Sequence, residues 1–325
     1  MKRRVCFSVI FAGLIMAVTF PLFAADQAAS QQSRMQLNET SYGYEVTIDG
    51  KTFVGYHRDF KGTPILWPVI GPNEKQMTRA FPMSDAASGE KKDHPHHRSI
   101  WFTQDGVNGN RHWNDGTIAH QEFLKAECDG QNAVIATKNH WLDKESKAVI
   151  CSDIRTVTFG MIDGLRYIDY DVVLTAEQDE VTIGDTKEGT FGIRVPTSVD
   201  VDSKKGGTIV NAQGDKDGAA WAKRSNWVDY SGPIDGEIMG LTVFNHPASF
   251  RHPTWWHVRT YGLFAANPFG IKDFDKSLEQ DGTVVLKKGE SLEFYHRVIL
   301  HAGNAESLDI ENLYKKYTET PKGKP

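Results

Sequence analysis

The sequence has few cysteines and none of the common nucleotide-binding signatures. Only three cysteines occur among the 325 residues, so a disulfide framework cannot organise the chain. Neither a P-loop nor a GxGxxG motif is present. Eight Trp, ten Tyr and seventeen Phe nevertheless supply enough apolar surface for a packed core. This composition excludes an intrinsically disordered chain.

After residue 25 the sequence also lacks a long hydrophobic run and any block of basic residues. Without such a run, no later segment is expected to span a bilayer. The whole chain has 37 Lys and Arg against 42 Asp and Glu, a net charge of −5. Without Lys2, Arg3 and Arg4 the balance is 34 against 42, or −8. This acidic balance predicts no nucleic-acid partner, because phosphate binding needs a basic face.

The N-terminus has the anatomy of a secretory signal peptide. Lys2, Arg3 and Arg4 precede an apolar run over residues 5–20, and a small-residue cleavage site follows near Ala24 and Ala25. No cysteine follows that site, so a lipoprotein anchor is not expected. The sequence therefore predicts a periplasmic or secreted protein, with an uncleaved anchor as the alternative. We divide the chain into a signal peptide (1–25), a single β domain (26–319) and a polar tail (320–325).

Most of the remaining chain predicts short strands joined by turns. Residues 42–48 and 52–56 flank Asp49-Gly50, the signature of a type I′ hairpin. Residues 165–175 alternate between apolar and polar side chains, as a strand with one buried face does. Further strands are expected at 96–103 and 257–263, among about fifteen in all. The pattern predicts an all-β fold, a large antiparallel β-sandwich formed by one domain.

Only one helix is expected, at the C-terminus. Asn304 can cap it, and Leu308, Leu313, Tyr314 and Tyr317 fall on one face at helical spacing. The polar residues after Glu319 predict a frayed end.

Cys6 lies in the predicted signal peptide, so Cys128 and Cys151 remain in the β domain. The expected strand register indicates whether these two can form a disulfide. Residues 121–128, 131–141 and 148–158 predict a three-stranded meander. In that register Cys151 lies level with about Gln121, seven residues from Cys128. Seven strand residues span roughly 23 Å, far beyond the reach of a disulfide. Two free thiols are the expectation, with a disulfide as the alternative.

Residues 93–115 (DHPHHRSIWFTQDGVNGNRHWND) form the densest polar and aromatic segment. On an extended chain His94 and His96 would share one face and His97 would lie on the other. Two imidazoles spaced in this way can bind one divalent metal together with a third ligand from elsewhere. They can equally serve as general acids or bases, or brace a loop. The three interpretations remain open from the sequence.

Three further segments combine charge with aromatic or histidine side chains. In residues 185–194, Lys187 next to Glu188 can tune a carboxylate base. In residues 245–259, Trp255 and Trp256 suggest a floor for a sugar ring, with Arg259 as a polar partner. The alternative is that these tryptophans belong to the core and that the arginines form their surface rim. Residues 221–230 mix the same residue types, and a simple surface strand explains them equally well.

Four ordered segments within about residues 50–301 carry a resemblance to a known family. They are DHPHHRSIWF, DTKEGTFGIRV, WAKRSNWVDYSG and RHPTWWHVRTYGLFAANPFG. Together they resemble the bacterial family often labelled methane oxygenase PmoA, an uncharacterised domain family. That label evokes an integral membrane subunit. Because no segment after the signal peptide can span a membrane, methane oxidation is not expected here.

A second resemblance concerns the fold. The segment GTVVLKKGESLEFYHRVILHAG is similar to the closing hairpin of galactose mutarotase-like proteins, and HPHHRSIW is similar to their histidine-containing strand. The resemblance implies a β-supersandwich whose concave sheet holds His94, His96, His97, Glu188 and His257. It also implies a His acid and a Glu base acting on a sugar. The histidine and glutamate spacings of a true mutarotase are not matched, so mutarotation itself is not expected.

The leading hypothesis is an exported carbohydrate-active enzyme that performs lyase, hydrolase or epimerase chemistry on a sugar or uronate. Its catalytic candidates are His96, His97, Glu188 and His257. Its substrate-binding candidates are Arg79, Trp101, Asn108, Trp113, Lys187, Arg194, Arg224, Trp255 and Arg259. One alternative is a non-catalytic glycan-binding protein. The other is a metalloenzyme acting on an oxidised sugar, with His94 and His96 holding one divalent metal.

Overall fold

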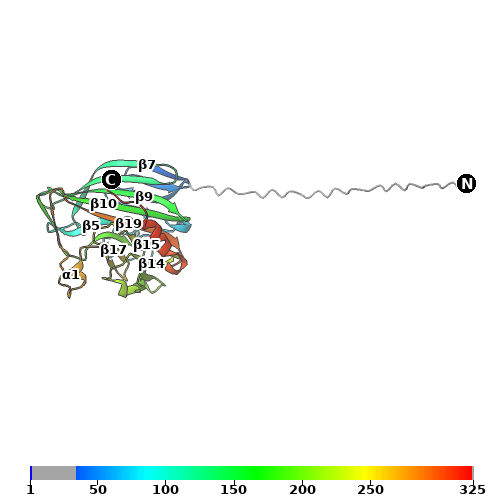
Figure 1. Ribbon diagram of the computed structural model, residues 1–325. Helices are drawn as coiled ribbons and strands as arrows, with labels where there is room; N and C mark the ends of the chain where they lie inside the picture. Colours follow the sequence, from blue (N-terminus) through cyan, green and yellow to red (C-terminus); the bar gives the residue numbers. More distant parts are fainter. Residues whose placement is uncertain (2–33, 324–325) are drawn as a thin grey trace. The chain divides into compact units, whose positions relative to one another are not determined.

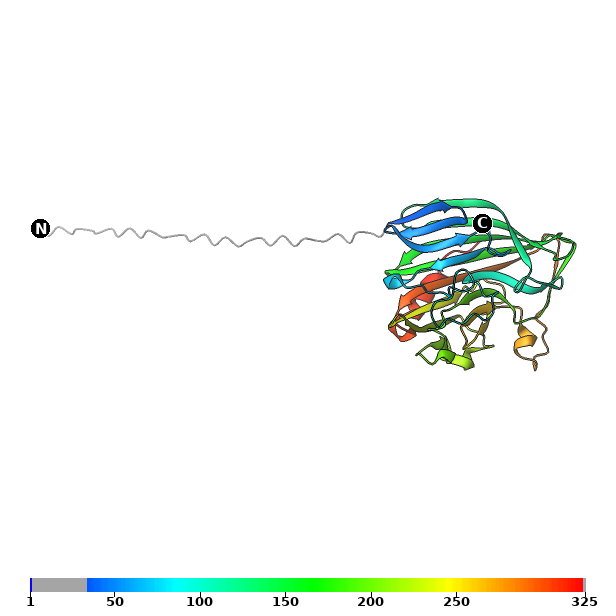
Figure 2. The same ribbon diagram turned by 180° about the vertical axis from the view of Figure 1, so that it is seen from behind.

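The computed structural model describes Met1 and residues 34–323 (Figures 1 and 2). The predicted signal peptide and its cleavage site lie outside the described residues. Residues 34–323 fall within one compact unit. None of the helices in this part of the chain is long and apolar enough to cross a membrane.

The described residues form two antiparallel sheets, which confirms the all-β prediction. The eight-stranded sheet has the order β13 (Thr208–Asn211), β14 (Trp227–Ile234), β15 (Glu237–Asn245), β19 (Ser291–Ala302), β10 (Leu165–Ala176), β9 (Val149–Ile162), β8 (Ala133–Leu142) and β7 (Thr117–Cys128). The eleven-stranded sheet has the main path β1 (Met35–Thr40), β2 (Gly43–Ile48), β3 (Lys51–His57), β4 (Ile65–Val69), β5 (Ile100–Val107), β12 (Gly189–Arg194), β17 (Leu263–Asn267) and β16 (Trp255–Val258). Three short strands, β6 (Asn110–Arg111), β11 (Glu180–Ile183) and β18 (Val284–Lys287), extend it beside β5. Figure 2 shows its blue N-terminal strands.

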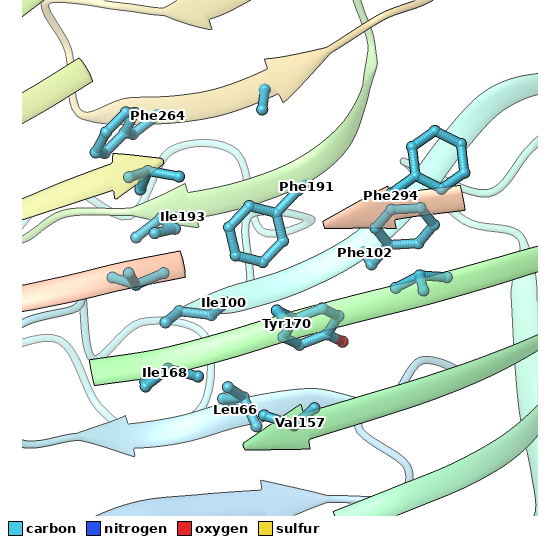
Figure 3. Packing of buried hydrophobic residues seen from close by; sticks show 14 of the residues in the cluster. Leu66, Ile100, Phe102, Val157, Ile168, Tyr170, Phe191, Ile193, Phe264 and Phe294 are labelled. Carbon is cyan, nitrogen blue, oxygen red and sulfur yellow. The ribbon is translucent and has the colours of Figure 1, made fainter. Parts of the chain in front are cut away.

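The two sheets pack face to face through one apolar core (Figure 3). Phe102 on β5 meets Phe294 on β19, with ring centroids 5.2 Å apart. Phe191 on β12 meets Tyr170 on β10 at 5.1 Å. These contacts join strands far apart in the sequence, because alternate residues of each strand point into the sandwich. The large antiparallel β-sandwich is therefore confirmed.

Several local predictions are also confirmed. Asp49 and Gly50 have φ angles of 51° and 77°, as a type I′ turn requires, and they join β2 to β3. The predicted meander is β7, β8 and β9. Cys151 pairs with Trp141, which pairs with Ile118, ten residues from Cys128 and three from the predicted Gln121; two one-residue bulges in β7 account for part of this difference. Both cysteines are free.

Helices are short and lie outside the sheets. They comprise α1 (Ile271–Phe274), α2 (Ile310–Thr318) and the 3₁₀ turns η1 (Pro72–Glu74), η2 (Val201–Ser203), η3 (Asp217–Ala220) and η4 (Ala305–Ser307). The C-terminal helix α2 is confirmed, but it begins later than expected. Asp309 caps it by accepting a hydrogen bond from the Asn312 amide, whereas Asn304 precedes η4 and makes no cap bond.

The polar tail is held more firmly than its composition suggests. Lys322 lies beyond α2, yet its side chain is only 4% exposed. Its Nζ donates to both carboxylate oxygens of Asp171, at 3.0 and 2.8 Å. The prediction of a frayed end is therefore wrong at this residue, because a half-buried carboxylate on β10 provides the partner.

Candidate active site

The candidate site lies on the outer face of the eleven-stranded sheet. Register aligns Ile65, Trp101, Gly192, Ala265 and His257 in one row across β4, β5, β12, β17 and β16. The neighbouring residues along each strand point into the core, so this row faces away from it. Trp101 and His257 thus share a surface although 156 residues separate them in the sequence.

Gly192 gives this surface room for two indole rings. A Cβ placed on Gly192 would lie 2.7 Å from Trp101 and 2.9 Å from Trp113, closer than real side chains approach. Both tryptophans are 1% exposed, and their Nε1 atoms are buried without a partner. In this structure they offer a ligand almost no exposed surface, and their role as substrate contacts stays a prediction. They form the packed base on which the histidine segment lies.

The segment before β5 is a turn, not the extended strand that was predicted. His94 has a φ of 43°, and its carbonyl accepts a hydrogen bond from the His97 amide at 2.9 Å. The expected sharing of one strand face by His94 and His96 is therefore wrong. The turn still gathers the three imidazoles, because their ring centroids lie 4.5 to 5.5 Å apart.

Two buried arginines hold the turn in place. Arg79 is fully buried and donates to the Asp93 carboxylate at 2.6 Å and to the carbonyls of His94 and His97 at 3.0 and 3.4 Å. Arg194 donates to the same Asp93 oxygen at 2.8 Å. Burial raises the pKa of Asp93, but the Arg194 and Arg79 charges outweigh it and hold that pKa below its usual value. Arg79 and Arg194 thus hold the turn through protein acceptors, and a contact of either side chain with substrate stays a prediction.

Arg194 also fixes the protonation of His97. Its Nη1 lies 2.9 Å from His97 Nδ1, and a guanidinium can only donate. Nδ1 must therefore accept, so the hydrogen of the neutral ring is on Nε2. Burial, followed by the Arg194 charge, lowers the pKa of His97 well below its usual value. His97 Nε2 makes no hydrogen bond to a described residue, and it is not one of the fully buried polar atoms that lack a partner. His97 thus presents a neutral N–H donor.

The hydrogen of the neutral His257 ring is on the other nitrogen, Nδ1. Its Nδ1 lies 2.7 Å from the Lys187 carbonyl oxygen, which can only accept. Nδ1 therefore carries the hydrogen, and the lone pair is on Nε2. Burial lowers the pKa of His257 to about 4, while the Glu188 charge opposes that shift. At neutral pH His257 consequently presents an unprotonated ring nitrogen.

Glu188 connects the separate groups of the site electrostatically. Its carboxylate acts to raise the pKa of His94, His96 and His257, in each case against the effect of burial. Its charge therefore reaches imidazoles from both the turn and β16. Lys187 Nζ lies 3.3 Å from Glu188, so the expected pairing is present. The structure brings together His94, His96, His97, Glu188, Lys187 and His257.

Tyr261 belongs to the same site and was not predicted. Its ring stacks on His94 at a centroid distance of 5.2 Å and an interplanar angle of 17°. The predicted strand 257–263 is in fact broken here, since β16 ends at Val258 and β17 begins at Leu263. Tyr261 and Arg259 lie in the tip of that hairpin. The available sequence signal was the alternate spacing of His257, Arg259 and Tyr261.

Asn108 and Trp255 were predicted as substrate contacts, and both bind or pack against residues other than the clustered histidines. Asn108 binds the Gln178 side chain and the Thr182 amide in a loop beside β11. Trp255 is 8% exposed and packs in a separate apolar cluster. Trp256 is fully buried in the main core, because consecutive strand residues face opposite sides. The two tryptophans therefore cannot form one sugar-binding floor.

The Arg224 side chain also donates its hydrogen bonds to backbone carbonyls of the protein. Its Nε donates to the Pro253 carbonyl at 2.8 Å, and its Nη2 donates to the carbonyl of His252 at 3.2 Å. Its guanidinium also covers the Trp255 ring at 4.5 Å. Its predicted contact with substrate is not supported by this geometry.

The predicted metal ligands form a compact group. Ring nitrogens of His94, His96 and His97 lie within 4.8 Å of one another. His97 fits poorly as a ligand, because Arg194 occupies its Nδ1 lone pair and its Nε2 carries the hydrogen. Burial lowers the pKa of His94, and the Arg194 and Arg79 charges lower it further, but the Asp93 and Glu188 carboxylates act to raise it, so the charges around His94 do not decide against a cation. The pair His94 and His96 therefore stays a prediction as a metal site, without His97 as the third ligand.

We expect the free energy of unfolding to fall as the pH is lowered from about 6.5 to 4. Burial lowers the pKa of His112 and His257 to about 4 and that of His296 to about 3. The unfolded chain therefore binds protons in this pH range that the folded chain does not. Each such histidine contributes a slope of up to about 1.4 kcal/mol per pH unit.

Urea unfolding at pH 7, 6 and 5 tests this expectation. His296→Gln should flatten the slope, because His296 is buried against Phe191 with its Nδ1 unpartnered. A free energy of unfolding that stays constant or rises between pH 7 and pH 5 would contradict it.

Comparison with known proteins adds a family but no activity. No curated protein matches the chain. The structure is similar to a galactose mutarotase related enzyme from Lactobacillus acidophilus (12% identity, TM-score 0.33, covering 82% of this chain and 95% of that one). A galactose mutarotase-like protein from Lactobacillus casei gives 12% identity and a TM-score of 0.34, covering 82% of this chain and 100% of that one. A glycoside hydrolase family 97 enzyme from Pseudoalteromonas sp. gives 12% identity and a TM-score of 0.31, covering 84% of this chain and 34% of that one.

These similarities concern the fold at low TM-scores, and no activity follows from them. The methane oxygenase label finds no support in any of these comparisons. A family model does match residues 43–315, which is most of the chain. The chain belongs to the family of unknown function DUF6807.

Proposed function

We propose that the chain is a carbohydrate-active enzyme that performs acid/base chemistry at His257, His97 and Glu188. The opposite hydrogen-bond polarity of the two histidines carries this proposal. His257 Nε2 offers a lone pair and His97 Nε2 offers an N–H, and each assignment follows from a partner of fixed polarity. A proton acceptor and a hydrogen-bond donor on one surface are the minimum for moving a proton on a substrate.

Each group has a distinct part in such a reaction. His257 Nε2 accepts a proton from the substrate and becomes an imidazolium. The Glu188 carboxylate stabilises that imidazolium, since its charge already acts to raise the pKa of His257. His97 Nε2–H donates to the substrate oxygen on which negative charge develops. Arg194 and Asp93 keep His97 in the required tautomer.

Aromatic rings next to polar groups support a sugar as the substrate. The ring of Tyr261 is half-buried beside His94, and that of Trp221 is half-buried across the Arg259 guanidinium. The apolar faces of sugar rings pack on such rings while their hydroxyls bind polar neighbours. The N-terminal segment of the sequence supports export, so we also place this activity in the periplasm or outside the cell.

Glu188→Gln is expected to lower kcat/KM by about a hundredfold or more, because it removes the charge that stabilises the His257 imidazolium. The assay follows the products of neutral and uronate-containing oligosaccharides by NMR, before and after chelation. Glu180→Gln is the matched control, since Glu180 is an exposed partner of Lys287 on β11.

Three results would contradict the proposal. Full activity in Glu188→Gln would remove the assigned role of the carboxylate. Loss of activity on chelation would favour the metal alternative. Oligosaccharides that bind the wild-type protein and are never altered would indicate a glycan-binding protein.

A further inference from the structure

We propose that Arg259 forms a subsite for one carboxylate group, so that the substrate is a sugar acid such as a uronate. This inference rests on the proposed function, because it names the substrate class of the same site. It starts from the hydrogen bonds of the four arginines that the sequence predicted as substrate contacts. Arg79, Arg194 and Arg224 all donate to protein carboxylates or carbonyls. The Arg259 guanidinium donates to no acceptor among the described residues.

Two aromatic rings hold this unpaired guanidinium. Its central carbon lies 5.5 Å from the ring centroid of Trp221 and 5.5 Å from that of Tyr261. Such contacts fix the plane of the side chain without using its N–H donors. A planar fork with free donors matches the two oxygens of a carboxylate.

The backbone beneath Arg259 is anchored as well. The buried Tyr230 hydroxyl lies 3.2 and 3.1 Å from the carbonyl oxygens of Arg259 and Thr260, which share its single hydrogen. The Asp202 amide donates to the Thr260 carbonyl, and the Val195 amide donates to that of Gly262. The hairpin tip therefore does not have to become ordered when a ligand binds, which lowers the entropic cost of binding.

A surface hollow lies directly beside this side chain. Its volume is about 280 Å³, and it is lined by Gly218, Trp221, Val258, Arg259 and Thr260. That volume is near the lower limit for small-molecule sites, which suits one acidic group or one sugar unit. The Arg259 charge acts to lower the pKa of His257, so the subsite and the proposed base are electrostatically coupled.

The local charge balance favours a singly charged group. Lys187 faces Glu188 and Asp273 at 3.3 and 3.5 Å, so its charge is already countered. Arg194 shares the Asp93 carboxylate with Arg79. Arg259 has no acidic partner among the described residues, and its single charge matches a carboxylate better than a phosphate dianion.

The test compares D-glucuronate, D-glucose and glucose 6-phosphate as probes in calorimetric titrations of the full chain. We expect wild-type protein to bind glucuronate at least tenfold more tightly than glucose, and more tightly than glucose 6-phosphate. Arg259→Gln should abolish the preference, while Arg259→Lys should keep part of it and serve as the folded comparison. Arg58→Gln is the charge-matched control, because Arg58 is exposed and lies five strand positions away, roughly 24 Å.

Each outcome decides between the two proposals. Equal binding of glucuronate and glucose, no binding of either, or an unchanged preference in Arg259→Gln overturns the carboxylate subsite. A preference for the phosphate overturns it too. If neutral sugars are turned over with Glu188 required, the proposed function stands without this subsite. If Arg259 selects glucuronate and no saccharide is ever altered, the subsite stands and the enzymatic proposal fails.

Discussion

His257→Gln is expected to lower kcat/KM by about a hundredfold to ten-thousandfold with little change in the midpoint of thermal unfolding. The substitution removes the Nε2 lone pair that we assign as the proton acceptor. A glutamine can still donate to the Lys187 carbonyl, so the local backbone should keep its hydrogen bond. Steady-state kinetics with the substrate found by the oligosaccharide assay provides the measurement.

The pH profile adds a result that a structural role of His257 would not produce. Burial lowers the pKa of His257 to about 4, so kcat/KM should rise as the pH increases through about 4 and then level off. The variant should lack this rise. His120→Gln is the control, because His120 lies on β7 of the other sheet. Wild-type activity with an unchanged acidic limb in His257→Gln would remove His257 from the mechanism.

Asp153→Asn is expected to cost about 3 to 5 kcal/mol in the free energy of unfolding, the largest effect of any single substitution that we predict on stability. Asp153 and Arg155 are both buried, and their side chains face the interior of the sandwich. Arg155 donates to both Asp153 oxygens, at 2.9 and 2.8 Å. Without the carboxylate, a fully buried guanidinium keeps its charge and loses its counter-ion.

The same carboxylate also accepts from Asn139 at 2.7 Å and from Trp141 Nε1 at 2.6 Å, so the substitution weakens a network across β8 and β9. The measurement is the denaturant midpoint at constant pH. Asp163→Asn is the matched control, because its pair with Lys316 is exposed to solvent and should contribute about 0 to 1 kcal/mol. A loss below about 1 kcal/mol in Asp153→Asn would show that the buried pair is dispensable.

Local sequence signals predicted the elements that local chemistry controls. Asp49-Gly50 predicted its hairpin because both positions accept a positive φ. The alternation in residues 165–175 predicted which side chains of β10 enter the core. Helical spacing predicted α2, although Asp309 rather than Asn304 starts it. These features depend on neighbours within a few residues. The all-β prediction also came from local patterns of short strands and turns.

The main local error of the prediction was to extend two strands through segments that in fact turn at the site. The positive φ of His94 ended the expected strand before β5, and the hairpin tip at Arg259 and Tyr261 interrupted another. Histidine and arginine are compatible with either conformation, so alternation alone could not separate them.

The sequence by itself determined the residue types available to the site, and only the tertiary structure decided their roles. It offered His97, His257, Glu188 and four arginines, without saying which of them would be buried or paired. Strand register across β5, β12, β17 and β16 placed His257 on the same face as Trp101, on which the His97 ring stacks. Partners distant in the sequence then set their tautomers and left Arg259 without an acceptor among the described residues. The physical reason is that burial and hydrogen-bond partners are long-range properties of a β-sandwich, because its sheet neighbours can be more than a hundred residues apart.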